Sequence, residues 1–244
     1  MNSRPILGLL GGTFDPIHLG HFAVARAAQH ALDLQTIRFI PSAQPPHRPD
    51  SPRASGYHRL KMARLAVDAS DSSGARWEVS DVELDRNGPS YTFDTLHSVH
   101  AEGMTPQQLV FLTGADAFAE IGTWYRYPEV LDAAHFGVVA RPGTTLDSLR
   151  QRLPQLASRM IDVSEVTETS SPRIILIPAE TPDISSTDIR RLASRGQSVT
   201  ELVLPAVAAY IDQHSLYRAA PDAAEALDAP DAPDALAPKA PKAP

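Results

Sequence analysis

The chain has 244 residues, of which 43% are hydrophobic, and it carries a formal net charge of −7. That length and apolar content are enough for one complete α/β core. The absence of cysteine excludes disulfides, thiolate metal sites and thiol catalysis. The negative charge argues against a nucleic-acid partner, because affinity for phosphate backbones needs clustered lysines and arginines. The N-terminal apolar run is too short for a signal peptide and no run is long enough for a membrane span, so we expect a cytoplasmic protein without a membrane partner.

Apolar runs typical of buried strands alternate along the chain with patterns typical of helices. Strands are predicted at residues 5–10, 36–41, 77–84, 109–113, 136–140 and 174–178, the third as an edge or half-exposed strand. Helices are predicted from residue 19 onward and at 59–69, 91–100 and 128–134. This alternation predicts an α/β fold in a single domain: a doubly wound, Rossmann-like parallel sheet with helices on both faces. Ligands of such sheets bind beyond the carboxyl ends of the strands.

The segment GGTFDPIHLGH, residues 11–21, joins the first predicted strand to the first predicted helix. Gly11 and Gly12 are expected to form the turn, where the lack of a Cβ lets a ligand approach the backbone closely. The helix that follows offers unpaired N–H groups and a partial positive charge, both suited to phosphate. His18 and His21 are three residues apart in its first turn, so both rings are expected to face the same ligand.

Three common motifs do not fit this segment. A P-loop needs a lysine that residues 11–21 lack, a dinucleotide fingerprint needs a different glycine spacing, and an HExxH zinc site needs one more residue between the histidines. What remains is the pattern HxGH. Two histidines that merely cap a helix would explain an isolated pair, but not the GGTFDP segment that precedes them.

Polar and aromatic residues follow the strand predicted at 109–113. Gly114 and Asp116 come directly after it, where the carboxylate could accept ribose hydroxyls or could simply stabilise a helix N-terminus. Trp124 and Tyr125 come shortly afterwards. Two adjacent aromatic residues could belong to the core, but their polar neighbours also favour a stacking surface for a planar ring.

Two segments are predicted to open helices with hydroxyl side chains. Residues 90–92 (SYT) offer hydroxyl and N–H donors, although capping alone would explain Ser90. Residues 185–187 (SST) lie one turn before Arg190, which can give forked hydrogen bonds to phosphate oxygens. Capping alone would leave Arg190 unexplained. Two phosphate-type helix ends in one domain suggest a triphosphate and a second phosphorylated substrate.

Two segments read as loop or linker. Residues 42–55 are rich in proline and are predicted to form a long loop inside the domain, of the kind that is usually functional or mobile. Residues 219–244 consist almost entirely of alanine, proline and aspartate, and such a segment cannot bury enough apolar surface to offset its ordering entropy. We therefore expect a catalytic domain at 1–218 and a disordered tail at 219–244.

Taken together, these motifs resemble the bacterial nicotinate-mononucleotide adenylyltransferases of the HxGH nucleotidyltransferase superfamily. The resemblance rests on GGTFDPIHLGH, PPHR, SYTFDTL, GADAF, TWYRYPEVL, ARPG, ISSTDIR and LPAVAAYIDQHSLY, and it covers about residues 5–217. The HxGH and ISSTxIR motifs are shared with pantetheine-phosphate adenylyltransferases and cytidylyltransferases, whereas SYT and TWY favour a pyridine nucleotide. Arg48 stands where many relatives carry lysine, which keeps the charge but changes its geometry. The tail lies outside the family pattern.

The resemblance implies transfer of AMP from ATP to nicotinate mononucleotide, which gives deamido-NAD and pyrophosphate. It implies catalytic roles for His18, His21 and Arg190. The residues implied to bind ATP are Gly11, Gly12, Thr13, Phe14, His18, His21, Gly114, Asp116, Ser185, Ser186, Thr187 and Arg190. The residues implied to bind the mononucleotide are Asp15, His47, Arg48, Thr92, Trp124 and Tyr125. Mg²⁺ is expected to be carried by the ATP phosphates, without protein ligands of its own.

Two alternative functions remain open at this point. The chain could adenylylate nicotinamide mononucleotide, and an aromatic clamp favours either pyridine over the flexible arm of phosphopantetheine. It could also be a catalytically silent nucleotide-binding regulator, against which the intact His18, His21 and Arg190 argue. The oligomeric state is left open.

Overall fold

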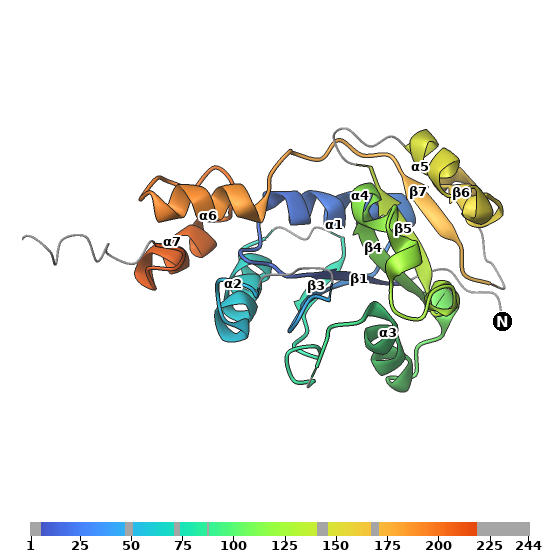
Figure 1. Ribbon diagram of the computed structural model, residues 1–244, viewed down its shortest axis with the longest axis horizontal. Coiled ribbons are helices and arrows are strands. Elements are labelled where there is room, and N and C mark those ends of the chain that lie inside the picture. The colour runs from blue at the N-terminus through green and yellow to red at the C-terminus, as the bar shows by residue number, and fades with distance from the viewer. Residues whose placement is uncertain are drawn as a thin grey trace, which may run out of the picture.

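The computed structural model describes residues 6–46, 51–70, 74–86, 88–140, 146–166 and 171–218. Over these ranges the chain forms a seven-stranded parallel sheet with the strand order β3-β2-β1-β4-β5-β7-β6 (Figure 1). The strands are β1 Leu7–Gly12, β2 Thr36–Pro41, β3 Arg76–Val79, β4 Leu109–Gly114, β5 His135–Val139, β6 Met160–Asp162 and β7 Ile174–Ile177. The helices are α1 Leu19–Leu32, α2 Gly56–Asp68, α3 Thr92–Ala101, α4 Ala115–Phe118, α5 Leu146–Arg152, α6 Ser186–Ser194 and α7 Pro205–Gln213. Within the described ranges, no helix is long and apolar enough to cross a membrane.

The sheet is doubly wound about the junction of β1 and β4. From β1 the chain moves outward through β2 to the edge strand β3, and it then returns to place β4 on the other side of β1. At such a junction the loops that follow the two strands run to opposite faces of the sheet. Ligands of open α/β sheets bind in the crevice between the two loops. The fold therefore brings the loop after β1 and the loop after β4 to one place.

Two apolar cores cover the two faces of the sheet. Because side chains alternate along a strand, β4 contributes Val110 and Leu112 to one core and Leu109 and Phe111 to the other. The first core contains residues of α1, α2, α6 and α7, and the second contains residues of α3, α4 and α5. Figure 1 shows α1 and α3 on opposite sides of the sheet. Covering both faces explains why the central strands are near-continuous apolar runs.

The predicted α/β fold is confirmed, with differences at particular elements. Each predicted strand is present, and the half-exposed one is the edge strand β3, although it ends at Val79. The helix predicted at 128–134 is wrong: that segment is the short 3-10 turn Glu129–Asp132, because β5 begins only three residues later. The strand β6 and the helix α5 were not predicted from the sequence pattern.

Candidate active site

Gly11 and Gly12 are the last two residues of β1, so the prediction of a turn at these two glycines is wrong. Both glycines pair with the end of β2. Their missing side chains make room for aromatic rings: a Cβ on Gly12 would lie 2.7 Å from the ring of Phe14, and one on Gly11 would lie 3.2 Å from that of Phe111. The turn to α1 is therefore made by residues 13–18, one step further along the chain.

Phe14 shapes this connecting loop. Its backbone lies in the left-handed region, with φ of 49°, and its side chain is buried. The ring packs edge-to-face against His21, with 4.9 Å between centroids. Phe14 thus contacts Gly12 on one side and His21 on the other, and it fixes how the histidine ring is presented to the cleft.

His18 and His21 come together as their spacing predicts. His18 is the N-cap of α1, and the two ring centroids lie 3.8 Å apart. Nδ1 of His21 accepts a hydrogen bond from the backbone N–H of His18 at 3.2 Å, which places the proton of the neutral ring on Nε2. His18 is buried, with 3% of its surface exposed, whereas His21 lines the cleft. The two histidines therefore differ in their exposure: His18 belongs to the interior, and His21 faces the cleft.

A cleft of about 340 Å³ opens at the carboxyl ends of β1 and β4. The predicted site residues that line it are Gly11, Gly12, Thr13, Phe14, His21, Thr92, Gly114, Asp116, Trp124 and Ser186. Its volume lies in the range of small-molecule sites. A larger hollow of about 1030 Å³ lies beside α5, but its Arg150 is paired with Asp147 and Asp162, which makes it a poor site for phosphate.

The loop after β4 supplies one wall of the cleft. Gly114 is the N-cap of the short helix α4, and Asp116 lies exposed in its first turn. A carboxylate in this position stabilises the helix N-terminus, and it also borders the cleft. Both interpretations of Asp116 from the sequence are therefore compatible with its place in the fold.

An aromatic group lies at one end of the cleft. The ring of Tyr125 stacks on that of Tyr91 at 4.3 Å between centroids, and 46% of the Tyr125 surface is exposed. Trp124 is half-buried: it packs edge-to-face on Phe111 of the core and also lines the cleft, so its position is compatible with both interpretations from the sequence. Trp124, Tyr125 and Thr92 line a small hollow of about 70 Å³ that suits the end of a flat ring.

Ser90 does not cap the helix that follows it. The N-cap of α3 is Tyr91, while the Ser90 hydroxyl accepts hydrogen bonds from the backbone N–H groups of Ala43 at 2.8 Å and Gln44 at 3.3 Å. The capping explanation considered for Ser90 is therefore wrong. This serine ties the start of α3 to the loop after β2, and so helps to hold Thr92 at the cleft.

The helix α6 begins with the serine cap that its sequence predicts. The hydroxyl of Ser185 accepts a hydrogen bond from the backbone N–H of Asp188 at 3.1 Å and donates one to its carboxylate at 2.7 Å. Asp188 lies in the first turn, where a negative charge is favourable. Capping by Ser185 leaves Ser186 and Arg190 for other contacts.

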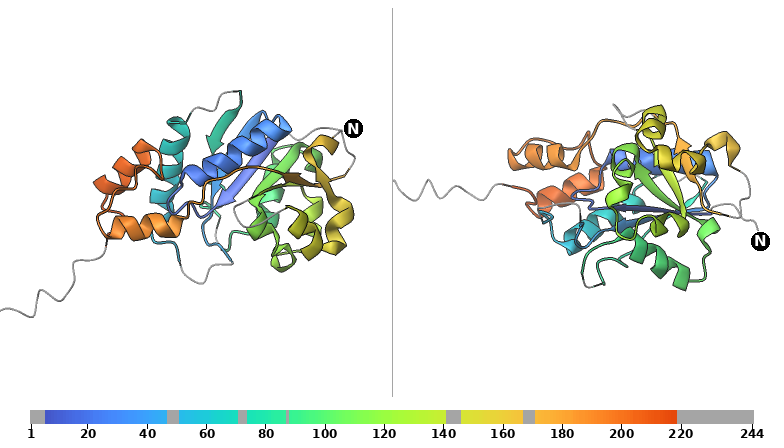
Figure 2. Two further views of the ribbon diagram at one scale, coloured as in Figure 1. Left: turned by 90° about the horizontal axis from the view of Figure 1, so that it is seen from above. Right: turned by 45° about the vertical axis from the view of Figure 1, so that its right-hand side comes forward.

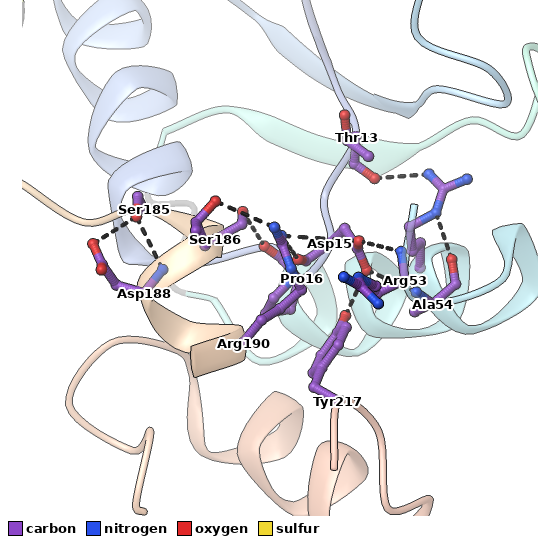
Figure 3. A network of polar contacts seen from close by, with 12 residues as sticks. Thr13, Asp15, Pro16, Arg53, Ala54, Ser185, Ser186, Asp188, Arg190 and Tyr217 are labelled. Atoms are coloured by element: carbon purple, nitrogen blue, oxygen red, sulfur yellow. Dashed lines mark hydrogen bonds and ion pairs between the residues drawn. The ribbon is translucent and has the colours of Figure 1, made fainter. Parts of the chain in front are cut away.

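Those contacts dock α6 onto the loop after β1 (Figure 3). The hydroxyl of Ser186 donates to the carbonyl of Pro16 at 3.0 Å, and Nη1 of Arg190 donates to the carbonyl of Asp15 at 2.8 Å. Nη2 of Arg190 donates to the hydroxyl of Thr187 at 3.2 Å. The start of α6 therefore packs against the loop that leads into α1, which brings together the two helix ends predicted to bind phosphate.

Asp15 lies in a setting that differs from the one expected of a substrate-binding residue. Its surface is only 3% exposed. One carboxylate oxygen accepts from the backbone N–H of Arg53 at 2.7 Å, and the other from the N–H of Ala54 at 3.0 Å and the hydroxyl of Tyr217 at 2.9 Å. These contacts give the side chain a structural role, and Asp15 does not line the cleft. Its assignment to the mononucleotide stays a prediction.

Arg59 is a structural residue that the sequence pattern did not single out. It is buried in α2, and its guanidinium donates to the carbonyls of Thr13 at 2.7 Å, Ser42 at 2.6 Å and Ala54 at 3.2 Å. Burial lowers its pKa, although Asp15 opposes that shift. Arg59 joins the loops after β1 and β2 to the start of α2.

Glu83 is a second residue of this kind. It is buried at the edge of the cleft, and its carboxylate accepts a hydrogen bond from the hydroxyl of Thr95 at 2.6 Å. Burial raises its pKa, while the hydrogen bond from Thr95 opposes the shift. The sequence pattern placed Glu83 in a strand, but β3 ends before it, so the alternation held no signal for its position.

Some predictions fall outside the described ranges. His47, Arg48 and residues 219–244 are among them. Among the residues described, no group of three or more histidine, aspartate or glutamate side chains is placed to hold a metal ion.

The model of the family described as "Cytidylyltransferase-like" matches residues 9–192. A Roseiflexus sp. protein named "Probable nicotinate-nucleotide adenylyltransferase" is 41% identical over 218 residues, which cover 89% of this chain and 100% of that protein. A protein of the same name from Pseudomonas aeruginosa is 40% identical over 215 residues, covering 87% of this chain and 97% of its own length.

A solved structure titled "Plasmodium falciparum nicotinic acid mononucleotide adenylyltransferase complexed with NaAD" matches with a TM-score of 0.66 at 17% identity. It covers 88% of this chain and 98% of its own length. A second structure of that enzyme, complexed with APC, matches with a TM-score of 0.63 at 16% identity over 86% of this chain and 96% of its own. At these identities the likeness shows the fold alone. The family model and the curated relatives go further: the chain belongs to the cytidylyltransferase-like family and, within it, to the nicotinate-nucleotide adenylyltransferases.

Proposed function

We propose that this chain transfers the AMP group of ATP to the phosphate of nicotinate mononucleotide. The new bond joins that phosphate to the α-phosphorus of ATP, the bond to the β-phosphate breaks, and pyrophosphate leaves. The observation that carries the proposal is a cleft lined by His21 and by Ser186 of the α6 N-terminus, which adjoins a smaller hollow lined by Trp124 and Tyr125. A phosphate-binding end beside a ring-binding end fits a mononucleotide that meets ATP.

The reaction needs neither a protein nucleophile nor a strong base. The mononucleotide phosphate is already ionised at neutral pH, so catalysis consists mainly of positioning and charge stabilisation. We assign His21, with the N-terminus of α1, to the α- and β-phosphates, where Nε2 can donate to an oxygen that gains charge. The buried ring of His18, whose centroid lies 3.8 Å from that of His21, completes this end of the site.

The departing pyrophosphate is assigned to the start of α6. The backbone N–H groups of Ser186 and Thr187, the hydroxyl of Thr187 and the guanidinium of Arg190 are the donors there, and Arg190 keeps 21% of its side chain exposed. ATP enters as its Mg²⁺ complex, in which the ion is bound by phosphate oxygens. Asp116 and Gly114, on the wall formed by β4, are assigned to the ribose.

The pyridine ring is assigned to the aromatic end of the cleft. Thr92 is the first residue of α3, where backbone N–H groups have no carbonyl partner inside the helix. Those N–H groups would give charge-assisted hydrogen bonds to the carboxylate of nicotinate, whereas the amide of nicotinamide would have to present its oxygen to them. Trp124 and Tyr125 provide apolar surface for the ring itself.

Substrate preference tests the proposal. Hydrogen bonds to a charged group are worth about 1.5–3 kcal/mol each, so two of them predict a preference of at least about a hundredfold in kcat/KM for the acid over the amide. Release of pyrophosphate, measured with ATP and each mononucleotide in turn, gives this ratio. Equal efficiencies would contradict acid selectivity and favour nicotinamide mononucleotide, and no turnover with any acceptor would favour a silent regulator.

Trp124→Ala separates recognition of the ring from recognition of its substituent. Stacking acts on the ring, so this variant should raise KM for both mononucleotides and leave the ratio between them largely unchanged. Tyr57→Ala is the matched control, because Tyr57 is an aromatic residue that is 69% exposed on α2 and does not line the cleft. A Trp124→Ala variant with unchanged KM for both acceptors would contradict the assignment.

A further inference from the structure

Tyr217 joins the C-terminal end of the described chain to the loop after β1. It follows α7 by four residues, and its hydroxyl donates a 2.9 Å hydrogen bond to Asp15 across 202 positions of sequence. The backbone of Tyr217 lies in the left-handed region, with φ of 66°, which is costly for a bulky side chain. Such a conformation persists only where the surrounding contacts determine it. Those contacts include the buried carboxylate of Asp15 (Figure 3).

The chemistry of the pair makes Tyr217 a permanent donor. Burial raises the pKa of its phenol, and the charge of Asp15 raises it further, because a phenolate beside a carboxylate would be repelled. The hydroxyl therefore remains protonated at neutral pH, and it donates to Asp15 rather than accepting.

Three hydrogen bonds satisfy the carboxylate of Asp15, and its ion pair with Arg190 is long. Tyr217 and the N–H groups of Arg53 and Ala54 supply three hydrogen bonds to it. Arg190 donates instead to the backbone carbonyl of Asp15 at 2.8 Å, and its Nη1 lies 3.9 Å from the nearer carboxylate oxygen. The guanidinium of Arg190 thus lies beside Asp15 without a close contact to its carboxylate.

Removal of the Tyr217 hydroxyl would change the contacts between Asp15 and Arg190. A buried carboxylate that has lost one of its three hydrogen-bond donors is stabilised when a nearby cation moves closer. Arg59 is fixed by the carbonyls of Thr13, Ser42 and Ala54, so Arg190 is the cation that can move. A tighter pair between Arg190 and Asp15 would withdraw the guanidinium from the phosphates that we assign to it.

We infer that Tyr217 is a positioning residue for ATP: by satisfying Asp15 it keeps Arg190 available to the triphosphate. The inference rests on the proposed function, since the role of Arg190 toward phosphate is part of it. Tyr217 touches neither substrate, and it acts through Asp15. The C-terminal segment is thereby part of the machinery that binds the nucleotide, although it does not line the cleft.

Tyr217→Phe in the full-length chain tests the inference. It removes one hydroxyl and keeps the ring, so the variant should remain folded. We expect KM for ATP to rise about fivefold to tenfold, with KM for the mononucleotide unchanged and kcat within about threefold of the parent, because a hydrogen bond to a charged group is lost at the ATP end alone. An unchanged KM for ATP would overturn the inference.

Tyr210→Phe is the matched control. Tyr210 is a buried tyrosine of α7 whose hydroxyl lies 2.9 Å from Nδ1 of His58, away from Asp15. Its loss should lower the unfolding midpoint to a degree similar to that of Tyr217→Phe while leaving both KM values unchanged. If both variants raised KM for ATP alike, general loosening would explain the effect and the inference would be wrong.

A double-mutant cycle identifies the route. If Tyr217 acts through Arg190, then adding Tyr217→Phe to Arg190→Lys should raise KM for ATP by less than about twofold over Arg190→Lys alone. Full additivity would overturn the inference.

The Kd of ATP, measured by titration without any acceptor, should rise in Tyr217→Phe in parallel with KM. This readout does not depend on the identity of the mononucleotide. A wrong acceptor would therefore be distinguished from a wrong role for Tyr217. An unchanged Kd would count against Tyr217, whatever acceptor the enzyme uses.

Discussion

His21 combines a structural contact and a proposed catalytic one on two atoms of the same ring. Nδ1 accepts the backbone N–H of His18, and Nε2 is the atom that we assign to phosphate. Substitution by alanine would remove both contacts, and the loss of a helix cap alone costs about 0.5–2 kcal/mol. Asparagine is the better test, because its side-chain oxygen can take the place of Nδ1.

His21→Asn should lower kcat by about a hundredfold or more, since one donor to the developing charge is lost. The unfolding midpoint should stay close to that of the parent, which thermal denaturation would show. His30→Asn is the control, because His30 is an exposed histidine in the last turn of the same helix. Activity of His21→Asn within a few-fold of the parent would rule out the assigned role.

His135 predicts a pH dependence of stability. Burial lowers its pKa to about 4, whereas an unfolded chain takes up this proton near pH 6.5. The unfolded state therefore binds more protons between these values, and the free energy of unfolding falls as pH falls from about 6.5 to 4. Nδ1 of His135 accepts the backbone N–H of Arg173 at 3.1 Å, a contact that an asparagine oxygen can replace.

Urea unfolding of the parent and of His135→Asn, at a series of pH values, would measure this contribution. The variant should lose less stability than the parent between pH 6.5 and 4, by at most about 3 kcal/mol. His30→Asn should follow the parent. Identical pH profiles for the parent and His135→Asn would show that His135 does not titrate in this way.

Single residues mark the limit of what the sequence could predict about the site. The buried positions of α2 are Arg59, Met62, Ala63 and Ala66, whose spacing follows one helix face. That spacing places Arg59 on the buried face of α2. From the sequence alone, however, a charged residue at the end of an apolar stripe is expected to be exposed. For Tyr217 and Asp15 no local pattern exists, because their contact joins positions 202 apart.

At the scale of elements, α6 shows how a local motif acquires a role from its docking. The serine cap was predicted from sequence, and Ser185 confirms it. The contacts of Ser186 with Pro16 and of Arg190 with Asp15 depend on the path of the chain after β7. The cap could be predicted because it lies within four residues, whereas the docking follows from the whole sheet.

Arg190→Lys should raise KM for ATP about tenfold, because a point charge replaces a planar guanidinium that can bind two oxygens. Arg191→Lys is the matched control on the same helix: Arg191 pairs with Asp188 at the surface, and its side chain is 60% exposed. Steady-state kinetics with ATP varied would separate the two variants. Equal effects of both changes would indicate a general effect of charge on α6 instead.

The elements that the sequence predicted and those that it missed differ in their packing. β1, β2, β4 and β5 are central strands covered on both faces, so they read as apolar runs. β6 is a three-residue strand at the edge of the sheet, and α5 is two turns long. Elements this short carry too few residues for a period to show.

At the scale of the whole molecule, the C-terminal segment of the described chain packs against one of the two apolar cores. α6 and α7 lie together at the end of the molecule away from α5, as Figure 2 shows in both views. Tyr217 is the last residue of the described chain that packs against either apolar core. The boundary predicted at residue 218 therefore falls just after a residue that the fold uses.

A chain shortened to end at Arg218 should keep the kcat, KM and unfolding midpoint of the parent, because no residue of either described core is removed. A chain shortened to end at Gln213 should lose stability and bind ATP more weakly, since Leu216 and Tyr217 are then missing. Thermal denaturation and ATP titration of both chains would measure the difference. Loss of folding in the longer one would place the boundary elsewhere.

The order in which the chain is synthesised gives the docking of α6 and Tyr217 a further consequence. The loop after β1 is made among the first residues, yet its partners Ser186, Arg190 and Tyr217 follow it by 170, 175 and 202 positions. Contacts between such distant segments are slow to form, because a long loop must close first. A nascent chain that stops before α6 would hold β1 to β7 and only one of the two helix ends that we assign to phosphate. The ATP site that we propose is thus complete only when translation has passed the last of these partners, so incomplete chains would bind the nucleotide more weakly than the full chain.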